Sequence, residues 1–288
     1  MNVAVFGATG VVGRALVPLL AEHELTAVSR TARDEPGARW VVADAASGDG
    51  VAAAVEGADV VYYLVHSLGA RDFEEQDRAA AETVAGEAAN AGVQQIVYLG
   101  GLGATRDAES AHLRSRAETA ERLSAGPVPV TTLRAGMVVG AGSAAFETIR
   151  ALVDRLPAMI CPRWVSTPTQ PIALRDVVAY IAGVCGHEAA LGRSFDIAGP
   201  EVMTYRAMIE RIARLRGKRL LIVEVPVLTP RLSSWWLHLV TPVNASVARP
   251  LIDGLRTPTV AHDDDIRELV SVEQTSFDDS VRLALEDD

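Results

Sequence analysis

Lysine, cysteine and long apolar runs are scarce in this 288-residue sequence. Lys218 is the one lysine among 27 basic residues, which excludes lysine chemistry everywhere else in the chain. The two cysteines, Cys161 and Cys185, are too few for a disulfide framework or a cysteine metal cluster, so we expect buried thiols, a reducing cytoplasm and no metal site. No apolar run reaches the roughly 18 to 20 residues that span a bilayer, and residues 1–20 lack a signal-peptide pattern. We therefore expect a cytoplasmic protein without an integral membrane segment.

Positive charge is also in deficit, with 37 acidic residues against 27 basic ones and a formal net charge of −10. Such a field repels phosphate backbones, so nucleic acid is not an expected partner, although a small anion could be held locally. Apolar residues make up 49% of the chain and charged residues 22%, which is typical of an ordered globular protein. A small homo-oligomer is compatible with base rates for soluble proteins, and the sequence does not give the oligomeric state.

Short apolar runs alternate with Ala-rich helical stretches through the first half of the chain. The expected strands are 3–6, 25–28, 40–43, 60–65, 96–99 and 130–133, and the longest expected helix covers 72–91. This alternation predicts an α/β fold with a doubly wound parallel Rossmann sheet. We expect residues 1–140 to form a dinucleotide-binding core, and residues 141–288 a smaller substrate-side region that is partly interleaved with it.

The second half is less regular, because several prolines interrupt it. We expect a helix over 174–183, strands over 194–197 and 220–225, and a final helix capped by Ser276. Residues 228–255 carry Trp235 and Trp236 on expected helices. This segment fits a pocket lid or a dimer surface better than a membrane-surface or quinone contact, because its polar face lacks lysine.

A glycine turn follows the first expected strand directly. Gly7-Ala8-Thr9-Gly10-Val11-Val12-Gly13 has the spacing G-x-x-G-x-x-G between strand and helix. The first glycine permits the tight turn, the second lets backbone N–H groups approach a pyrophosphate, and the third allows close packing of helix on strand. An ordinary glycine-rich connection is the alternative, and the position in a βα unit favours dinucleotide binding over it.

The second expected strand ends in Ser29-Arg30, where an NAD-specific site would place an acid on the ribose 2′-hydroxyl. Arg30, with Arg33 nearby, can pair with a 2′-phosphate, and Ser29 can donate a hydrogen bond to it. NADP(H) is therefore the preferred cofactor and NAD(H) the alternative. Asp44 is a candidate for the adenine amino group, with helix capping as its other interpretation.

Five segments resemble the atypical short-chain dehydrogenases/reductases, in their extended, NmrA-like branch. They are GATGVVG (7–13), VVYYLVHSLG (60–69), IVYLGGLG (96–103), TTLRAGMVVGAGS (131–143) and QPIALRDVVAYI (170–181). The same segments are similar to the 39 kDa accessory subunit of respiratory complex I. The resemblance covers most of the chain but points to no single substrate.

The resemblance also implies positions around the cofactor. Leu64, Val65 and His66 would lie beneath it after the fourth strand, and Leu99 and Gly100 after the fifth. Ala135, Gly136 and Met137 would flank the nicotinamide, and Ser143, Phe146, Glu147 and Trp164 would line the substrate side. Strand-end packing is the alternative role for these residues.

Active members of the wider family use a Tyr-x-x-x-Lys pair, which this chain cannot contain because its one lysine is Lys218. His112 and Arg116 stand at the tyrosine and lysine positions, one helical turn apart. Arg116 can hydrogen-bond a ribose, and a histidine, with an ordinary pKa near ~6.5, can donate a proton as hydride arrives. His66 is a second candidate for that proton transfer, and a polar residue at an element end is the alternative for both histidines.

Two functions remain open at this stage. The first is an NAD(P)-dependent oxidoreductase acting on a small, partly apolar carbonyl or enone as its small-molecule substrate. The second is a non-catalytic NADP(H)-binding redox sensor or assembly protein, which the loss of the tyrosine and lysine pair favours.

Overall fold

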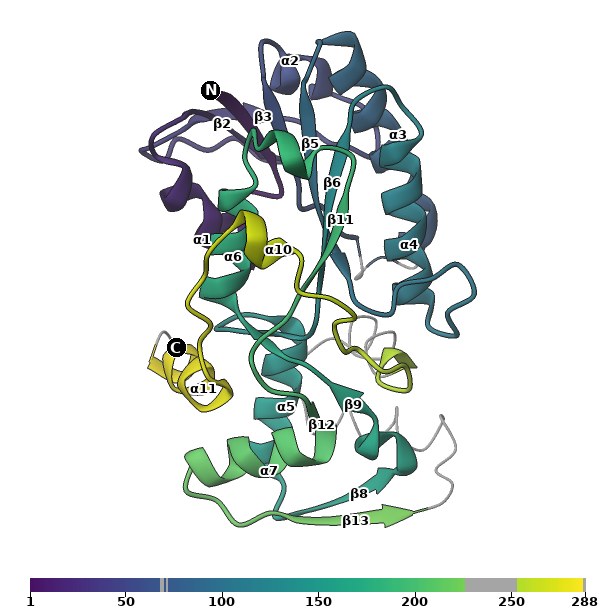
Figure 1. Ribbon diagram of the computed structural model, residues 1–288, viewed down its shortest axis with the longest axis vertical. Coiled ribbons are helices and arrows are strands. Elements are labelled where there is room, and N and C mark those ends of the chain that lie inside the picture. The colour runs from purple at the N-terminus through teal and green to yellow at the C-terminus, as the bar shows by residue number, and fades with distance from the viewer. Residues whose placement is uncertain (68–69, 71, 226–252, 287–288) are drawn as a thin grey trace.

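A seven-stranded parallel sheet dominates the computed structural model, which describes residues 1–67, 70, 72–225 and 253–286 (Figure 1). Its strands are β1 (Asn2–Phe6), β2 (Glu24–Ser29), β3 (Arg39–Val42), β4 (Val60–Tyr63), β5 (Gln95–Gly101), β6 (Val130–Ala135) and β11 (Ser194–Ile197). They stand in the order β11-β6-β5-β4-β1-β2-β3, and every pair of neighbours is parallel. The strand order reverses between β1 and β4, which confirms the predicted doubly wound Rossmann sheet.

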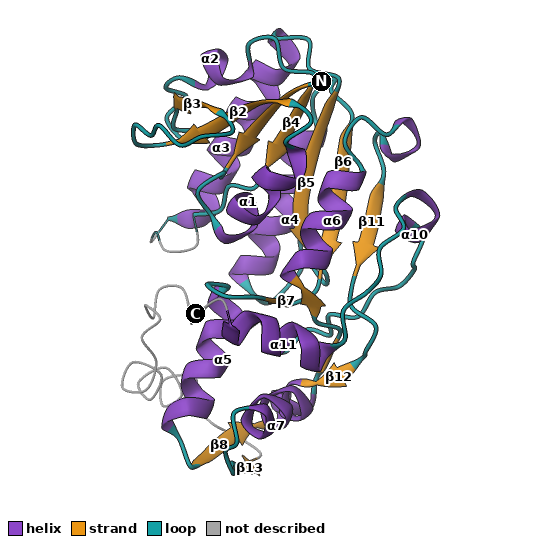
Figure 2. Ribbon diagram, turned by 90° about the vertical axis from the view of Figure 1, so that its left-hand side faces the viewer, coloured by secondary structure: helices purple, strands orange, loops and turns teal. Residues whose placement is uncertain are grey.

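Helices cover both faces of this sheet (Figure 2). They are α1 (Val11–Leu16), α2 (Val51–Val55), α3 (Phe73–Asn90), α4 (Ala111–Ser124) and α6 (Leu174–Gly183). Helices α1 and α6 pack on one face around Val5 and Tyr62, whereas α2, α3 and α4 pack on the other around Phe6 and Tyr63. Because both faces are buried, β4 is a continuous apolar run rather than an alternating one.

The long helix α3 agrees closely with the expected range of 72–91. Glu74 and Glu75 lie in its first turn, where negative charge interacts favourably with the helix dipole. Gly92 ends it with a φ of 74°, a left-handed conformation that glycine adopts without strain. Local sequence chemistry therefore accounts for both ends of this helix.

The second half of the chain adds a smaller layer at the carboxyl ends of the sheet strands. Its helices are α5 (Ala144–Arg155), α7 (Tyr205–Leu215) and α11 (Phe277–Glu286), with the 3-10 turn η2 (Arg163–Ser166). Helix α10 (Ile266–Leu269) packs on the core of the main sheet instead, and the 3-10 turns η1 (Val17–Leu20) and η3 (Glu188–Ala190) also lie outside this layer. Its strands pair two by two: β7 (Val138–Val139) with β10 (Ile172–Ala173), β8 (Ala158–Pro162) with β13 (Leu221–Val225), and β9 (Pro168–Thr169) with β12 (Met203–Thr204). A separate hydrophobic cluster that includes Phe146, Met208 and Val281 holds α5, α7 and α11 together.

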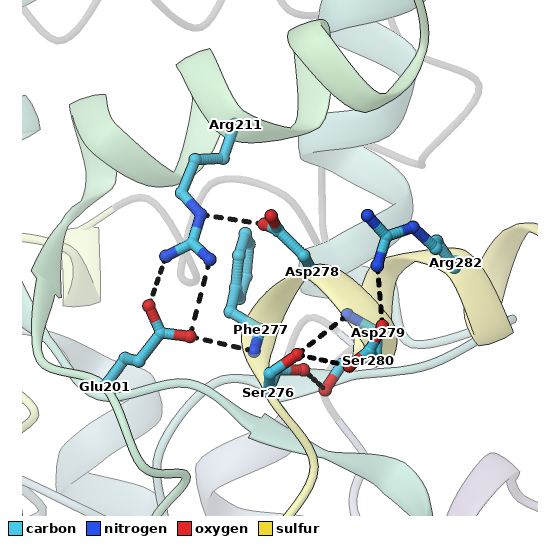
Figure 3. Close-up of polar contacts among 8 residues, drawn as sticks. All are labelled: Glu201, Arg211, Ser276, Phe277, Asp278, Asp279, Ser280 and Arg282. Atoms are coloured by element: carbon cyan, nitrogen blue, oxygen red, sulfur yellow. Dashed lines mark hydrogen bonds and ion pairs between the residues drawn. The ribbon is translucent and has the colours of Figure 1, made fainter.

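Charged contacts fix α11 against this layer (Figure 3). Ser276 caps the helix as expected, since its Oγ accepts a hydrogen bond from the N–H of Asp279 at 3.2 Å. Arg211 of α7 pairs with Glu201 and, at 2.8 Å, with Asp278 of α11. The carboxylate of Glu201 also accepts a hydrogen bond from the first N–H of the helix, that of Phe277.

The two regions are joined by more than the chain connection, because residues beyond 140 return to the sheet. Strand β11 pairs with β6 over four residues, and α6 packs beside α1. The expected strand over 220–225 is found as β13, five residues long. The sequence predicts helices over 228–255, with Trp235 and Trp236. Residues 226–252, which include both tryptophans, are outside the part of the chain that the structure describes.

Within the ranges that the structure describes, no helix is long and apolar enough to cross a membrane.

Candidate functional site

The carboxyl ends of β1, β2, β3 and β4 border a cavity of about 570 Å³. Its lining contains nine of the residues that the sequence singles out: Gly7, Thr9, Gly10, Ser29, Arg30, Asp44, Leu64, Val65 and His66. In open α/β sheets a ligand binds at the carboxyl ends of the strands, where the strand order reverses. The cavity lies at that point of the fold, between β1 and β4.

The glycine turn forms one wall of the cavity, and two of its glycines are sterically required. Gly7 has a φ of 86°, and a Cβ there would lie 2.8 Å from the carbonyl oxygen of Leu64. A Cβ on Gly13 would overlap the carbonyl oxygen of Gly7. Gly10 is exposed at the start of α1, so the turn offers bare backbone to the cavity. This cradle fits the phosphates of a dinucleotide.

The rest of the turn supports this wall. The carbonyl of Thr9 accepts a hydrogen bond from Arg14 at 2.7 Å. Val12 packs against the sheet core. Val11 borders a second cavity, of about 790 Å³, between α1, α6 and α11. Val11, Val12 and Gly13, which the sequence also predicts as cofactor-binding, are therefore not among the residues that line the first cavity.

At the end of β2, Arg30 is exposed beside the cavity, and it forms no ion pair with any described residue. The hydroxyl of Ser29 lies 3.5 Å from that of Thr31 and accepts a hydrogen bond from the N–H of Thr31. Arg33 lies away from the cavity lining: it pairs with Glu35 at 2.7 Å. Arg30, rather than Arg33, is thus the guanidinium at the cavity.

Asp44 faces the same cavity from the loop after β3. Its Oδ1 accepts a hydrogen bond from the N–H of Ala46 at 2.9 Å, which closes a local turn. A carboxylate can accept several hydrogen bonds, so Asp44 can still accept one from a ligand in the cavity.

A chain of hydrogen-bonded polar side chains begins at the cavity wall and runs between α3 and α4. His66 Nδ1 lies 2.8 Å from Asp77 Oδ2, and His66 Nε2 lies 3.2 Å from His112 Nδ1. Ser115 donates a hydrogen bond to Asp77 Oδ2, and the N–H of Ser67 donates one to Oδ1, both at 2.8 Å. The structure therefore places the two predicted histidines in contact, and adds a buried carboxylate that the sequence interpretation did not include.

Burial and neighbouring charges set the protonation states of this chain. Burial, followed by the positive charge of Arg116, lowers the pKa of His66 below its usual range. The same two effects hold the pKa of His112 well below its usual range, with His66 as a further cause. Burial raises the pKa of Asp77, but hydrogen bonds from His66, Ser115 and Ser67 outweigh it and leave that pKa lowered. Both rings are thus neutral and the carboxylate is ionised near neutral pH.

Arg116 lies at the carboxyl end of β5, where one of its terminal N–H groups donates to the carbonyl of Leu99 at 3.0 Å. Tyr98 donates its hydroxyl to the backbone carbonyl of Arg116 at 3.1 Å. Gly100 lies in the same strand, and a Cβ there would lie 3.4 Å from Tyr98. The guanidinium is half-buried and retains further donors on its other nitrogens.

The segment predicted to flank the nicotinamide joins β6 to β7. The carbonyl of Ala135 accepts a hydrogen bond from Leu102 at 2.8 Å, and that of Met137 accepts one from Ile172 at 3.0 Å. A Cβ on Gly136 would overlap the carbonyl oxygen of Gln170. Close backbone packing is one physical reason for glycine at this position.

The four residues predicted for the substrate side have structural partners of their own. Phe146 differs most from the expectation, because it is fully buried in the second hydrophobic cluster and exposes no surface to a ligand. Trp164 is half-buried against the same cluster. Ser143 donates to the carbonyl of Val138 at 2.8 Å. Glu147 accepts from the N–H of Gly142 at 3.1 Å and pairs with Arg150.

Asp77 could have been found from the sequence. It lies between Phe73 and Ala80 on the face of α3 that packs on the sheet, where every other buried side chain is apolar. A charge in an apolar helical register indicates a paired, buried group. Among the described residues, no group of histidine, cysteine and acidic side chains has a geometry that would hold a metal ion.

Sequence comparisons relate this chain to nucleotide-binding proteins and reductases. Residues 7–138 match the profile of a family described as NAD(P)H-binding. The mitochondrial NADH dehydrogenase (ubiquinone) 1 alpha subcomplex subunit 9 of Arabidopsis thaliana is 24% identical over 223 residues, which cover 72% of this chain and 56% of that protein. The (4-alkanoyl-5-oxo-2,5-dihydrofuran-3-yl)methyl phosphate reductase of Streptomyces griseus subsp. griseus is 29% identical over 238 residues, 78% of this chain and 77% of that enzyme. The match thus spans little more than half of the plant subunit.

Solved structures share the fold over the whole chain. The triphenylmethane reductase of Citrobacter sp., complexed with NADP(H), superposes with a TM-score of 0.78 at 18% identity, covering 99% of this chain and 100% of that one. An NADPH-dependent quinone oxidoreductase of Escherichia coli, complexed with NADPH, gives a TM-score of 0.77 at 19% identity, over 98% and 99%. These neighbours confirm the Rossmann fold, and the segment that matches the NAD(P)H-binding profile contains the glycine turn and the sheet strands β2 to β6.

Proposed function

We propose that this chain is an NADP(H)-dependent reductase of small, partly apolar carbonyl or enone compounds. Its residues 7–138 match the NAD(P)H-binding family profile, and its fold is similar to that of an NADP(H)-complexed reductase. The observation that carries the proposal is the pairing of two features. A backbone cradle for a dinucleotide opens into a cavity, and His66, on the wall of that cavity, is hydrogen-bonded to His112. One feature binds the cofactor and the other moves protons.

Arg30 supports the choice of NADP(H) over NAD(H). It is a guanidinium at the cavity with no ion-pair partner among the described residues, and a 2′-phosphate accepts charge-assisted hydrogen bonds from such a group. Asp34 and Glu35 are exposed on the following loop and do not line the cavity, and Glu35 is already paired with Arg33. No carboxylate therefore occupies the end of β2, where an NAD-specific site would have one.

The Streptomyces relative supports an unsaturated carbonyl as the substrate class. Its name describes a reductase of a 5-oxo-2,5-dihydrofuran, a ring alkene conjugated to a carbonyl group. The bound cofactor would supply the hydride that such an alkene or carbonyl accepts. His112 would then supply the proton that balances the new negative charge, and Arg116 would hold the ribose through its remaining N–H donors.

Calorimetric titration tests the cofactor part of this proposal. NADPH and NADH are titrated into the wild type, into Arg30→Ala and into Arg33→Ala, the latter as a matched control that removes an arginine outside the cavity. We expect NADPH to bind more tightly than NADH in the wild type and in Arg33→Ala, and the difference to vanish in Arg30→Ala. Equal affinities in the wild type would remove the 2′-phosphate assignment, and no binding of either nucleotide would remove the whole proposal.

The catalytic part is tested by NADPH oxidation with a panel of cyclic enones, dihydrofuranones and quinones. The absence of a tyrosine and lysine pair, together with the similarity to a respiratory-complex subunit, favours one alternative, a non-catalytic NADP(H)-binding protein. Tight binding of NADPH with no oxidation by any member of the panel would support that alternative. Oxidation that is lost in His112→Phe would support the reductase.

A further inference from the structure

Asp77 is a carboxylate that is only 2% exposed, in the middle of a helix face that is otherwise apolar. Burying an ionised carboxylate is costly unless hydrogen-bond donors compensate for the lost water. Asp77 has three such donors at 2.8 Å, from His66, Ser115 and the backbone of Ser67. A group of this kind is expected to have a specific partner.

The hydrogen-bond geometry, together with the lowered pKa of His66 that keeps its ring neutral, determines which nitrogen of each ring carries its proton. An ionised carboxylate can only accept, so His66 must carry its proton on Nδ1, which faces Asp77. The ring is neutral, so its Nε2 is an acceptor, and His112 must carry its own proton on Nδ1 to donate across the 3.2 Å contact. The Nε2 of His112 is then unprotonated, and it is the last ring nitrogen in this series of hydrogen-bonded side chains.

We propose that Asp77 is a positioning residue that holds His66 and His112 in the Nδ1–H tautomer and so makes Nε2 of His112 the atom that exchanges the proton in reduction. The proton-transfer part of this inference rests on the proposed reductase function, whereas the tautomers do not. Neutral imidazole in water favours the opposite tautomer, Nε2–H. The arrangement is therefore a property of this site that an experiment can distinguish from an unconstrained histidine.

Protons and electrons balance in this step. Bound NADPH would supply the hydride that reduces the carbonyl or conjugated alkene, and the substrate oxygen would gain the proton from Nε2 of an imidazolium at His112. The Nδ1 proton of His112 stays in its bond to His66 throughout, and solvent returns the Nε2 proton afterwards. Asp77 stabilises the transient imidazolium through His66 without becoming protonated itself.

The surrounding charges act in both directions. Arg116 on α4 disfavours the protonated state of both rings, and Asp77 on α3 favours it. Tyr63 on β4 and Tyr98 on β5, whose pKa values burial raises, remain neutral beside the chain. Among the described side chains that affect the pKa of His112, Asp77 is therefore the negative charge that favours its protonation. Without it, His112 would be a poorer proton donor.

Long-range ¹H–¹⁵N correlation spectra of histidine-labelled protein test the tautomers without any turnover. His66→Asn and His112→Phe assign the two rings. We expect Nδ1–H patterns for both rings in the wild type and in Asp263→Asn, a matched loss of an exposed carboxylate. We expect the pattern of His66 to be lost in Asp77→Asn, because an amide can also donate. An Nε2–H pattern in the wild type would overturn the inference, and this measurement decides it even if Asp77→Asn does not fold.

Kinetics with an enone substrate test the role of Asp77 in proton transfer. General acid catalysis contributes roughly 10²- to 10⁴-fold, so we expect kcat at pH 7 to fall by at least about tenfold in Asp77→Asn. The acidic rise of the pH profile should move to lower pH, with unchanged affinity for NADPH. Ser115→Ala, which retains the charge, should shift the profile less and in the same direction. An unmoved profile would overturn the role of Asp77 in proton transfer. Nδ1–H tautomers without turnover on any substrate would leave the tautomer part standing, and would remove the reductase proposal together with the proton-transfer part.

Discussion

Replacing His112 with phenylalanine should make the free energy of unfolding less sensitive to acid. In the folded protein, burial, the charge of Arg116 and the neighbouring His66 hold the pKa of His112 well below 6.5, its ordinary value, which the unfolded chain retains. A histidine with a depressed pKa contributes stability that is fully present above the unfolded pKa. That stability is lost as the pH falls through 6.5 towards the folded pKa, because the unfolded chain binds a proton that the folded protein rejects.

The size of the effect follows from this linkage. Between pH 7.5 and pH 5.5, a ring that stays neutral in the folded state loses about 1.4 kcal/mol of stability. His66 contributes a loss of the same sign, because its pKa is also lowered. The wild type should therefore lose about 1.4 kcal/mol more over this interval than His112→Phe does.

Urea denaturation followed by tryptophan fluorescence at pH 7.5, 6.5 and 5.5 measures this difference. The variant will also be less stable at every pH, since His66 Nε2 loses its donor at a net cost of about 1 kcal/mol. The pH dependence, rather than the offset, is therefore the relevant quantity. Equal losses of stability on acidification in the two proteins would refute the burial of a neutral imidazole at position 112.

Three further changes probe the rest of the molecule. Gly86→Ala should raise the free energy of unfolding by about 0.5 to 1 kcal/mol in chemical denaturation, because Gly86 is exposed inside α3 and a Cβ there meets no other atom within 4 Å. Burial raises the pKa of Cys161 to about 11 and also raises that of Cys185. A thiol reagent at pH 8 should therefore react slowly with the native protein and rapidly with both thiols in urea. Fast reaction in the native state would contradict this. Arg211→Met should lower the midpoint of thermal unfolding by several degrees, because it breaks a network of ion pairs between α7 and α11. The control Arg282→Met removes a solvent-exposed ion pair and should leave the midpoint unchanged.

Sequence reasoning was most successful where a local rule determines the structure. The glycine turn, the alternation of strands and helices and the end of α3 at Gly92 all depend on backbone sterics and hydrophobic periodicity, and the fold class followed from them. The helix over 174–183 and the strand over 194–197 were predicted with the bounds that the structure shows. Glycine or proline lies at or near both ends of each element: Pro171 and Gly183 for the helix, and Gly192 and Gly199 for the strand.

The site was harder to predict, because it depends on contacts between elements that are distant in the sequence. His66 and His112 are 46 residues apart, and their mutual contact follows only from the packing of α3 and α4 at the end of β4. Phe146 shows the opposite limit, because a substrate-side position in the family's sequence pattern became part of the hydrophobic interior. Whether a side chain faces a cavity or a core depends on the rotation of α5, which its sequence alone does not fix.

The pairing of β11 with β6 has a consequence for how the chain can be divided. A fragment ending near residue 140 would keep the glycine turn and most of the sheet, but it would expose the open side of β6 along its length. An uncovered strand of this kind presents unpaired N–H and C=O groups that recruit other chains. It would also lose α6, which covers the face beside α1. The nucleotide-binding half of this protein is therefore not a portable module, and fusions or biosensors built on it need the chain to at least the end of β11.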